Sequence, residues 1–121
     1  MYFVPELWSG RFTMAAFLLR LTAHYPRNRF ARFNFDRDAV QERYFADDPR
    51  VRARFPALLR RTEAELRARA PNYRSFLACG SGHTIAANWS YYSFRQADWS
   101  LADWVERFVA GTPVPSVVCR R

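Results

Sequence analysis

The sequence contains no lysine, so all nineteen of its basic residues are arginine. With eleven acidic residues the formal net charge is +8, which raises the question of a nucleic-acid partner. A nucleic-acid footprint concentrates basic residues on one face and interleaves aromatic residues with them. Here the arginines are scattered, apart from the segment Arg50 to Arg69. We therefore attribute the charge to a GC-rich coding bias and expect no nucleic-acid partner.

Long apolar runs are also missing. A membrane-spanning helix needs about 20 consecutive apolar residues, and the longest run here, Met14 to Leu19, is far shorter. The first residues, Met1 to Pro5, lack both the basic start and the small-residue cleavage site of a secretory signal. We expect no membrane partner and no signal peptide in this chain.

Histidine and cysteine are scarce, with two of each. His24 and His83 lie far apart with no ligand set around either, so no metal site and no cofactor are expected. Cys79 and Cys119 permit at most one disulfide, and each sits next to the end of a predicted strand. A disulfide in an exported protein and two reduced cysteines in a cytosolic one both remain open.

The pattern that is present predicts one domain of mixed helices and strands. Half of the 121 residues are apolar, enough to bury a core. Hydrophobic periodicity and capping residues predict helices over 11–23, 39–46, 57–70 and 100–110, with another starting at Asp48-Pro49 and a kink or restart at Pro56. Strands are predicted over 29–35 and 73–79, and a strand or short hairpin over 88–95.

Two predicted helices carry an apolar stripe that we expect to be buried. On the helix over 57–70, the inward positions are Leu58, Leu59, Thr62 and Leu66. Its arginines and glutamates are expected on a solvated outer face with local ion pairs. On the last helix, the stripe consists of Trp104, Val105, Phe108 and Val109. The aromatic residues at strand spacing are expected to pack in the core: Trp89, Tyr91, Tyr92 and Phe94.

His83 is the residue around which the candidate chemistry is organised. It follows a buried strand and a Gly80-Ser81-Gly82 turn that leaves little bulk around the imidazole, which exchanges protons near neutral pH. Asp38 follows the other predicted strand, with Asp36 on the same loop as an alternative acid. The order acid then histidine is that of the second half of an α/β-hydrolase triad, in which the acid orients the histidine and the histidine deprotonates a serine. His24 ends a helix, where it favours the helix dipole.

A serine nucleophile is missing from this pattern. Its usual setting is Gly-x-Ser-x-Gly between a strand and a helix, and neither Ser9 nor Ser81 has glycines in that register. Cys79 is predicted to end a buried strand, which does not suit a nucleophile. From its residues, the chain offers an acid and a base without their nucleophile.

Three segments resemble the pectin acetylesterase family of serine carboxylesterases, which includes the Notum-type esterases, and its bacterial branch in particular. The segment Asp38-Ala39-Val40-Gln41 resembles the family's Asp-x-x-Gln motif after a strand. The segment Phe76 to Thr84, FLACGSGHT, resembles the loop that carries the triad histidine. The segment Trp99 to Val105, with the later Cys119, resembles the closing helix and tail.

The resemblance implies that residues 1–121 are the C-terminal part of an α/β-hydrolase domain, the last strands and helices of a mostly parallel sheet. It implies Asp38 as the triad acid, His83 as the base, and an ester substrate such as acetylated pectin or another acetylated glycan. Export is common in the family, which implies a secreted or periplasmic full-length protein. The nucleophile and the oxyanion hole are expected before Met1, so the isolated chain is expected to be inactive. The alternative is a non-catalytic remnant or a basic binding module for acidic polysaccharide.

Overall fold

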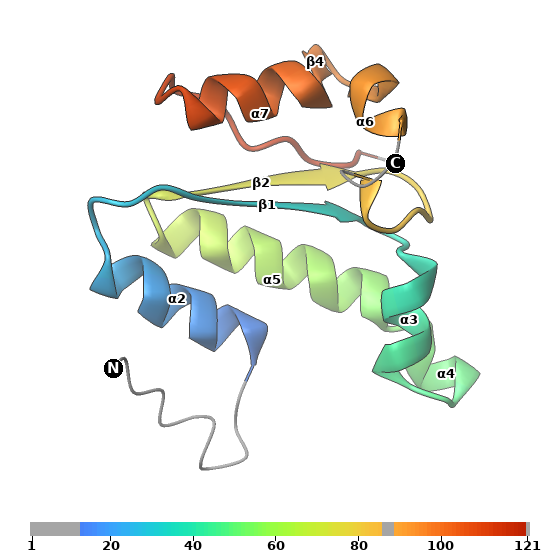
Figure 1. Cartoon of the computed structure of the whole chain (residues 1–121). Helices are drawn as coiled ribbons and strands as arrows, with labels where there is room; N and C mark the ends of the chain where they lie inside the picture. The colour runs from blue at the N-terminus through green and yellow to red at the C-terminus, as the bar shows by residue number, and fades with distance from the viewer. Residues whose placement is uncertain (1–12, 86–88, 121) are drawn as a thin grey trace.

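Two parallel strands form the sheet at the centre of the fold. A computed structural model describes residues 13–85 and 89–120. Strand β1 (Phe30–Phe35) pairs with β2 (Tyr73–Ala78) along their whole lengths, residue by residue. Because helices cover both faces of this parallel pair, the fold class is α/β, and three layers are seen edge-on (Figure 1).

The helices divide into a lower and an upper layer in the view of Figure 1. They are α2 (Met14–His24), α3 (Ala39–Phe45), α4 (Pro49–Arg52), α5 (Phe55–Arg69), α6 (Ser90–Ser93) and α7 (Leu101–Val109). Helices α2 and α5 pack against each other below the sheet, and α6 and α7 lie above it. A short hairpin leads into α7, and its two antiparallel strands, β3 (Arg95–Gln96) and β4 (Trp99–Ser100), have two residues each.

The connection from β1 to β2 explains where the candidate site lies. The chain leaves β1, passes through α3, α4 and α5 below the sheet, and enters β2 in the same direction (Figure 1). Such a crossover brings the carboxyl ends of both strands to the same edge of the sheet. The segment around Val117 extends the sheet beside β2, since Val117 N–H donates to Ser75 O and Leu77 N–H donates to Val117 O, both at 2.8 Å.

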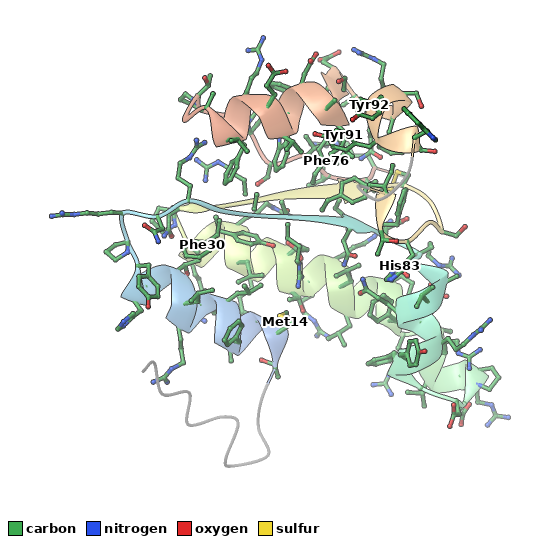
Figure 2. The ribbon with its side chains drawn as sticks, in the orientation of Figure 1. Met14, Phe30, Phe76, His83, Tyr91 and Tyr92 are labelled. Carbon is green, nitrogen blue, oxygen red and sulfur yellow. A yellow bond between two sulfur atoms is a disulfide. The ribbon has the colours of Figure 1, made fainter. Side chains whose placement is uncertain are left out.

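The upper face of the sheet carries an aromatic core. Phe76 is fully buried at its centre, and its ring lies edge-on to that of Trp104, with centroids 5.5 Å apart. Phe33 and Phe35 of β1 join the same cluster. Trp104 Nε1–H donates to the Pro115 carbonyl at 2.7 Å, so the large indole is buried without an unsatisfied donor. Figure 2 shows Phe76 on the α7 side of the sheet and Phe30 on the α2 side.

The lower face is more polar. Glu63 of α5 is buried, and it accepts hydrogen bonds from the Arg32 guanidinium and from Tyr73 Oη–H, the latter at 2.7 Å. Burial, with the neighbouring Glu63 charge, raises the pKa of the Tyr73 hydroxyl above its ordinary value. The prediction that the glutamates of this helix lie on a solvated face is therefore wrong at Glu63, because Arg32 from β1 supplies the counter-charge that its burial requires.

Several predicted boundaries are confirmed by capping bonds. Asp48 accepts from Arg50 N–H and Pro49 opens α4, while Ser100 accepts from Asp103 N–H at the start of α7. Pro56 lies in the first turn of α5, so it restarts the helix and does not kink it. Residues 11 and 12 of the first predicted helix lie outside the described residues.

Other expectations are wrong. Over 88–95 the described residues form helix α6 in place of a strand, and the hairpin begins only at Arg95, with residue 88 outside the described part. Trp89 and Tyr92, expected in the core, are 87% and 69% exposed. Their rings lie 6.0 Å apart at the i, i+3 spacing of a helical turn, a local contact that strand propensity does not anticipate.

Two positions on the apolar stripes also differ from expectation. Val109, at the last turn of α7, was expected in the buried stripe and is 78% exposed. Leu58 is exposed, whereas Leu59 and Leu66 of α5 are buried as expected. The stripe of α5 is rotated so that Glu63, and not Leu58, faces the sheet.

Candidate active site

The loops that follow β1 and β2 are joined by backbone hydrogen bonds. Asp36 N–H donates to Ala78 O at 2.8 Å, Arg37 N–H to Gly80 O at 3.0 Å, and Ala39 N–H to Ser81 O at 3.3 Å. The pairing of the two strands thus continues past their ends. It carries the loop with the aspartates alongside the loop that leads to His83.

The glycines of the second loop are required by the ring of Phe35. A Cβ atom on Gly82 would lie 2.7 Å from Phe35 Cε2, closer than side chains approach one another. Gly80 has a φ of +143°, which L-residues with side chains rarely adopt. Thr84, directly after His83, has a φ of 50°, uncommon for a β-branched residue and a local strain beside the imidazole.

Asp38 and His83 are brought into direct contact by these loops. His83 Nδ1 lies 2.7 Å from Asp38 Oδ2, and Asp38 is 2% exposed whereas the His83 side chain is 38% exposed. One nitrogen of the imidazole thus contacts a buried carboxylate. Figure 2 shows His83 at the end of the sheet, beside α3. With Nδ1–H donating to Asp38, Nε2 keeps its lone pair and can take a proton.

The Asp38 carboxylate is held by the helix that it caps. Its Oδ1 accepts from Val40 N–H at 3.0 Å and from Gln41 N–H at 2.9 Å, at the start of α3. Its Oδ2, which contacts His83, also accepts from Gln41 Nε2 at 3.3 Å. The same Gln41 nitrogen donates to Asn34 Oδ1 at 2.7 Å. Sequence reasoning gave no role to Asn34 or to the Gln41 side chain, although the spacing of Asp38 and Gln41, N-cap to third helical residue, signals that they can meet.

Asp36, the alternative acid, has different partners. It is fully buried, and its Oδ2 accepts from Arg60 of α5 at 2.7 Å, while its Oδ1 accepts from Gly80 N–H at 3.0 Å. Cys119 Sγ lies 3.5 Å from Asp36 Oδ2. Asp36 therefore joins the first loop to α5, to the second loop and to the C-terminal segment.

A disulfide joins Cys79 to Cys119, with their Cα atoms 5.0 Å apart. It ties the end of β2, just before the histidine loop, to the C-terminal segment. Gln96 reinforces the same junction: its Oε1 accepts from Cys79 N–H at 2.7 Å, and its Nε2 donates to Leu77 O and Val118 O at 2.8 and 3.0 Å. Cys79 is thus placed in a structural bond, which agrees with its rejection as a nucleophile.

A hollow of about 190 Å³ lies beside the Asp38–His83 pair. Phe33, Phe35 and Ile85 form its apolar part, and the only hydroxyl on its described lining belongs to Thr84. Ser81 does not line it, and no serine among the described residues donates a hydrogen bond to His83. What the described residues assemble is an acid–base pair beside an open space.

The remaining candidates lie away from this pair. His24 is the last residue of α2, exposed, with its ring edge-on to that of Tyr25. Within residues 13–85 and 89–120, histidine, cysteine and carboxylate side chains nowhere gather in threes as metal ligands. Of the helices in the same part of the chain, none has the length and apolar character needed to cross a membrane.

Comparison with known proteins adds no assignment to this geometry. No family model, no curated protein and no solved structure matches the chain.

Proposed function

We propose that this chain carries the acid and the base of a carboxylic ester hydrolase of the pectin acetylesterase type, within an α/β-hydrolase fold. The observation that carries the proposal is the 2.7 Å contact between His83 Nδ1 and Asp38 Oδ2, at the edge where two parallel strands end. Ligands of open α/β sheets bind at this edge. The motifs quoted above, which resemble those of the family, support the same assignment.

In the proposed reaction, His83 Nε2 takes the proton of a serine hydroxyl as its oxygen attacks the ester carbonyl. The imidazolium formed is stabilised by Asp38, and it then gives the proton to the departing alkoxide. Water repeats the sequence on the acyl-enzyme. The serine and the oxyanion-hole donors come from residues outside those described, and the substrate is an O-acetyl ester of pectin or a related glycan.

The test uses the longest protein that contains this chain, read in frame from its gene. We expect it to release acetate from acetylated pectin, and we expect Asp38→Asn to lower kcat by about 10⁴-fold because the imidazole loses its orienting carboxylate. His83→Ala should lower it at least as far. The 121-residue chain alone should show no turnover of 4-nitrophenyl acetate.

Two matched variants make the test specific. Glu42→Gln changes a carboxylate on α3 that pairs with Arg37 at 3.0 Å, away from the imidazole, and should leave kcat unchanged. Asp36→Asn removes the alternative acid and should reduce stability more than kcat. Turnover by the isolated chain that depends on His83, or loss of kcat in Asp36→Asn but not in Asp38→Asn, would overturn the assignment.

A second candidate function, binding of acidic polysaccharide without catalysis, is favoured by the arginines of α3 to α5. Arg43, Arg50, Arg54 and Arg61 are exposed, and no ion pair of their side chains is found among the described residues. Binding to polygalacturonate that weakens with salt, survives His83→Ala and is lost when these four are replaced by glutamine would support it. No binding at low salt would exclude it.

A further inference from the structure

Gln41 links three groups around the acid–base pair. Its side-chain nitrogen donates to Asp38 Oδ2 at 3.3 Å and to Asn34 Oδ1 at 2.7 Å, while its oxygen lies 3.5 Å from Asn34 Nδ2. Asn34 lies buried on β1. We propose that Gln41, oriented by Asn34, is a positioning residue that fixes the Asp38 carboxylate and thereby the tautomer and direction of the His83 ring. The inference rests on the proposed function for its purpose and on these contacts for its geometry.

The carboxylate needs such a partner on its reactive oxygen. Both donors to Oδ1, the N–H groups of Val40 and Gln41, belong to the helix backbone and hold that oxygen. On Oδ2 the partners are the His83 ring and the Gln41 side chain. Without the side chain, rotation about the Asp38 Cβ–Cγ bond is resisted only by the helix and the ring itself.

Asn34 determines which end of the Gln41 amide faces Asp38. The Asn34 oxygen accepts from the Gln41 nitrogen, so the amide presents an N–H, and not its oxygen, to the carboxylate. A flipped amide would place two acceptors against each other, which costs the hydrogen bonds on both sides. In the order Asn34, Gln41, Asp38, His83, the two donors are Gln41 and His83. Asn34 orients the Gln41 amide, and Asp38 orients the His83 ring.

A purely structural role for Gln41, stabilising the start of α3, predicts a different result from a positioning role. Loss of a structural contact changes the free energy of unfolding and leaves the imidazole unchanged. Loss of a positioning contact changes the ratio of the two neutral tautomers of His83. The chain has only two histidines, and exposed His24 is an internal reference.

The experiment is long-range ¹H–¹⁵N correlation of the imidazole nitrogens in the 121-residue chain, at a pH where both rings are neutral. In the wild type we expect His83 to carry its proton on Nδ1. In Gln41→Leu the ratio of Nδ1–H to Nε2–H should fall by about fivefold, the factor that one hydrogen bond supplies. Asn34→Leu should shift it in the same direction, and Glu42→Gln should not shift it.

The outcomes separate the inference from the proposed function. An unchanged His83 ratio in a folded Gln41→Leu variant overturns the positioning role and leaves the Asp38–His83 pair intact. A wild-type His83 with no preference for Nδ1–H shows that the pair itself is absent in solution, which removes the basis of the proposed function. If Gln41→Leu does not fold, Gln41→Glu keeps the shape and replaces the donor by an oxygen. It should shift the ratio at least as far, and an unchanged ratio there also overturns the inference.

Discussion

The two faces of the sheet are stabilised in different ways. The upper face, under α7, is an aromatic cluster in which Phe76 and Trp104 are almost fully buried. The lower face, against α2 and α5, has smaller apolar clusters separated by buried polar groups such as Glu63. In an apolar core the costly change is a loss of volume, whereas in a core with buried ion pairs it is the removal of one partner. The site lies at the end of the sheet, where the two meet.

The largest effect is expected from Phe76→Ala, which removes a whole ring from the upper cluster. Burial of the ring and the cavity left behind predict a loss of about 3–5 kcal/mol in the free energy of unfolding. The same truncation on the lower face, Phe30→Ala, should cost less than half as much, because Phe30 is only half-buried. Urea denaturation of both variants measures the difference. Equal losses would show that burial of an aromatic ring stabilises the two faces to the same extent.

The next effect concerns charge on the lower face. Glu63→Leu leaves the Arg32 guanidinium without its counter-charge and Tyr73 Oη–H without its acceptor, at a cost of about 2–3 kcal/mol, since Arg32 is partly solvated. Replacing all three partners by apolar residues, as Arg32→Met, Glu63→Leu and Tyr73→Phe together, should restore stability to within about 1 kcal/mol of the wild type. A triple variant less stable than Glu63→Leu would mean that the lower face needs its polar groups for packing.

The smallest effect is a dependence on alkaline pH. The pKa of Tyr73 is raised in the folded state, so below its ordinary value of 10.0 both folded and unfolded chains keep the proton and no stability is lost. Above that pH the unfolded chain releases the proton first, so the free energy of unfolding falls until the folded chain also ionises. Tyr73→Phe should make the free energy of unfolding fall less steeply with pH, by an amount that corresponds to at most one proton. Denaturation at a series of alkaline pH values measures this slope. If the wild type and Tyr73→Phe have the same slope, the Tyr73 hydroxyl is in contact with solvent and its pKa is not raised.

Features of either layer that depend on the local sequence were predictable, and features that depend on tertiary contacts were not. The α7 stripe and its Ser100 cap follow from local periodicity and capping, which the residues display directly. Burial of Glu63 depends on Arg32, which lies thirty-one residues away in the sequence, on β1. No window along the sequence contains that partner, so periodicity alone places the carboxylate in solvent.

The candidate site likewise combines features that the local sequence predicts with features that only tertiary contacts decide. Asp38 and His83 follow predicted strands, and parallel pairing of those strands was enough to bring them together. What separates Asp38 from Asp36 is tertiary: one caps α3 and meets the imidazole, the other meets Arg60 and the second loop. The orientation of Gln41 by Asn34 likewise requires the turn of the chain from β1 into α3.

The disulfide determines whether the fragments of the protein stay linked after proteolysis. Cys79 and Cys119 close a covalent ring over a sequence separation of 40, and the ring contains α6, the β3–β4 hairpin and all of α7. A protease that cuts once inside the ring leaves the two pieces linked, so the nicked protein migrates as one species until it is reduced. A single cut before Cys79 has no such tie, and the pieces remain together only through packing. The upper layer is thus secured by a bond, and the lower layer by contacts alone.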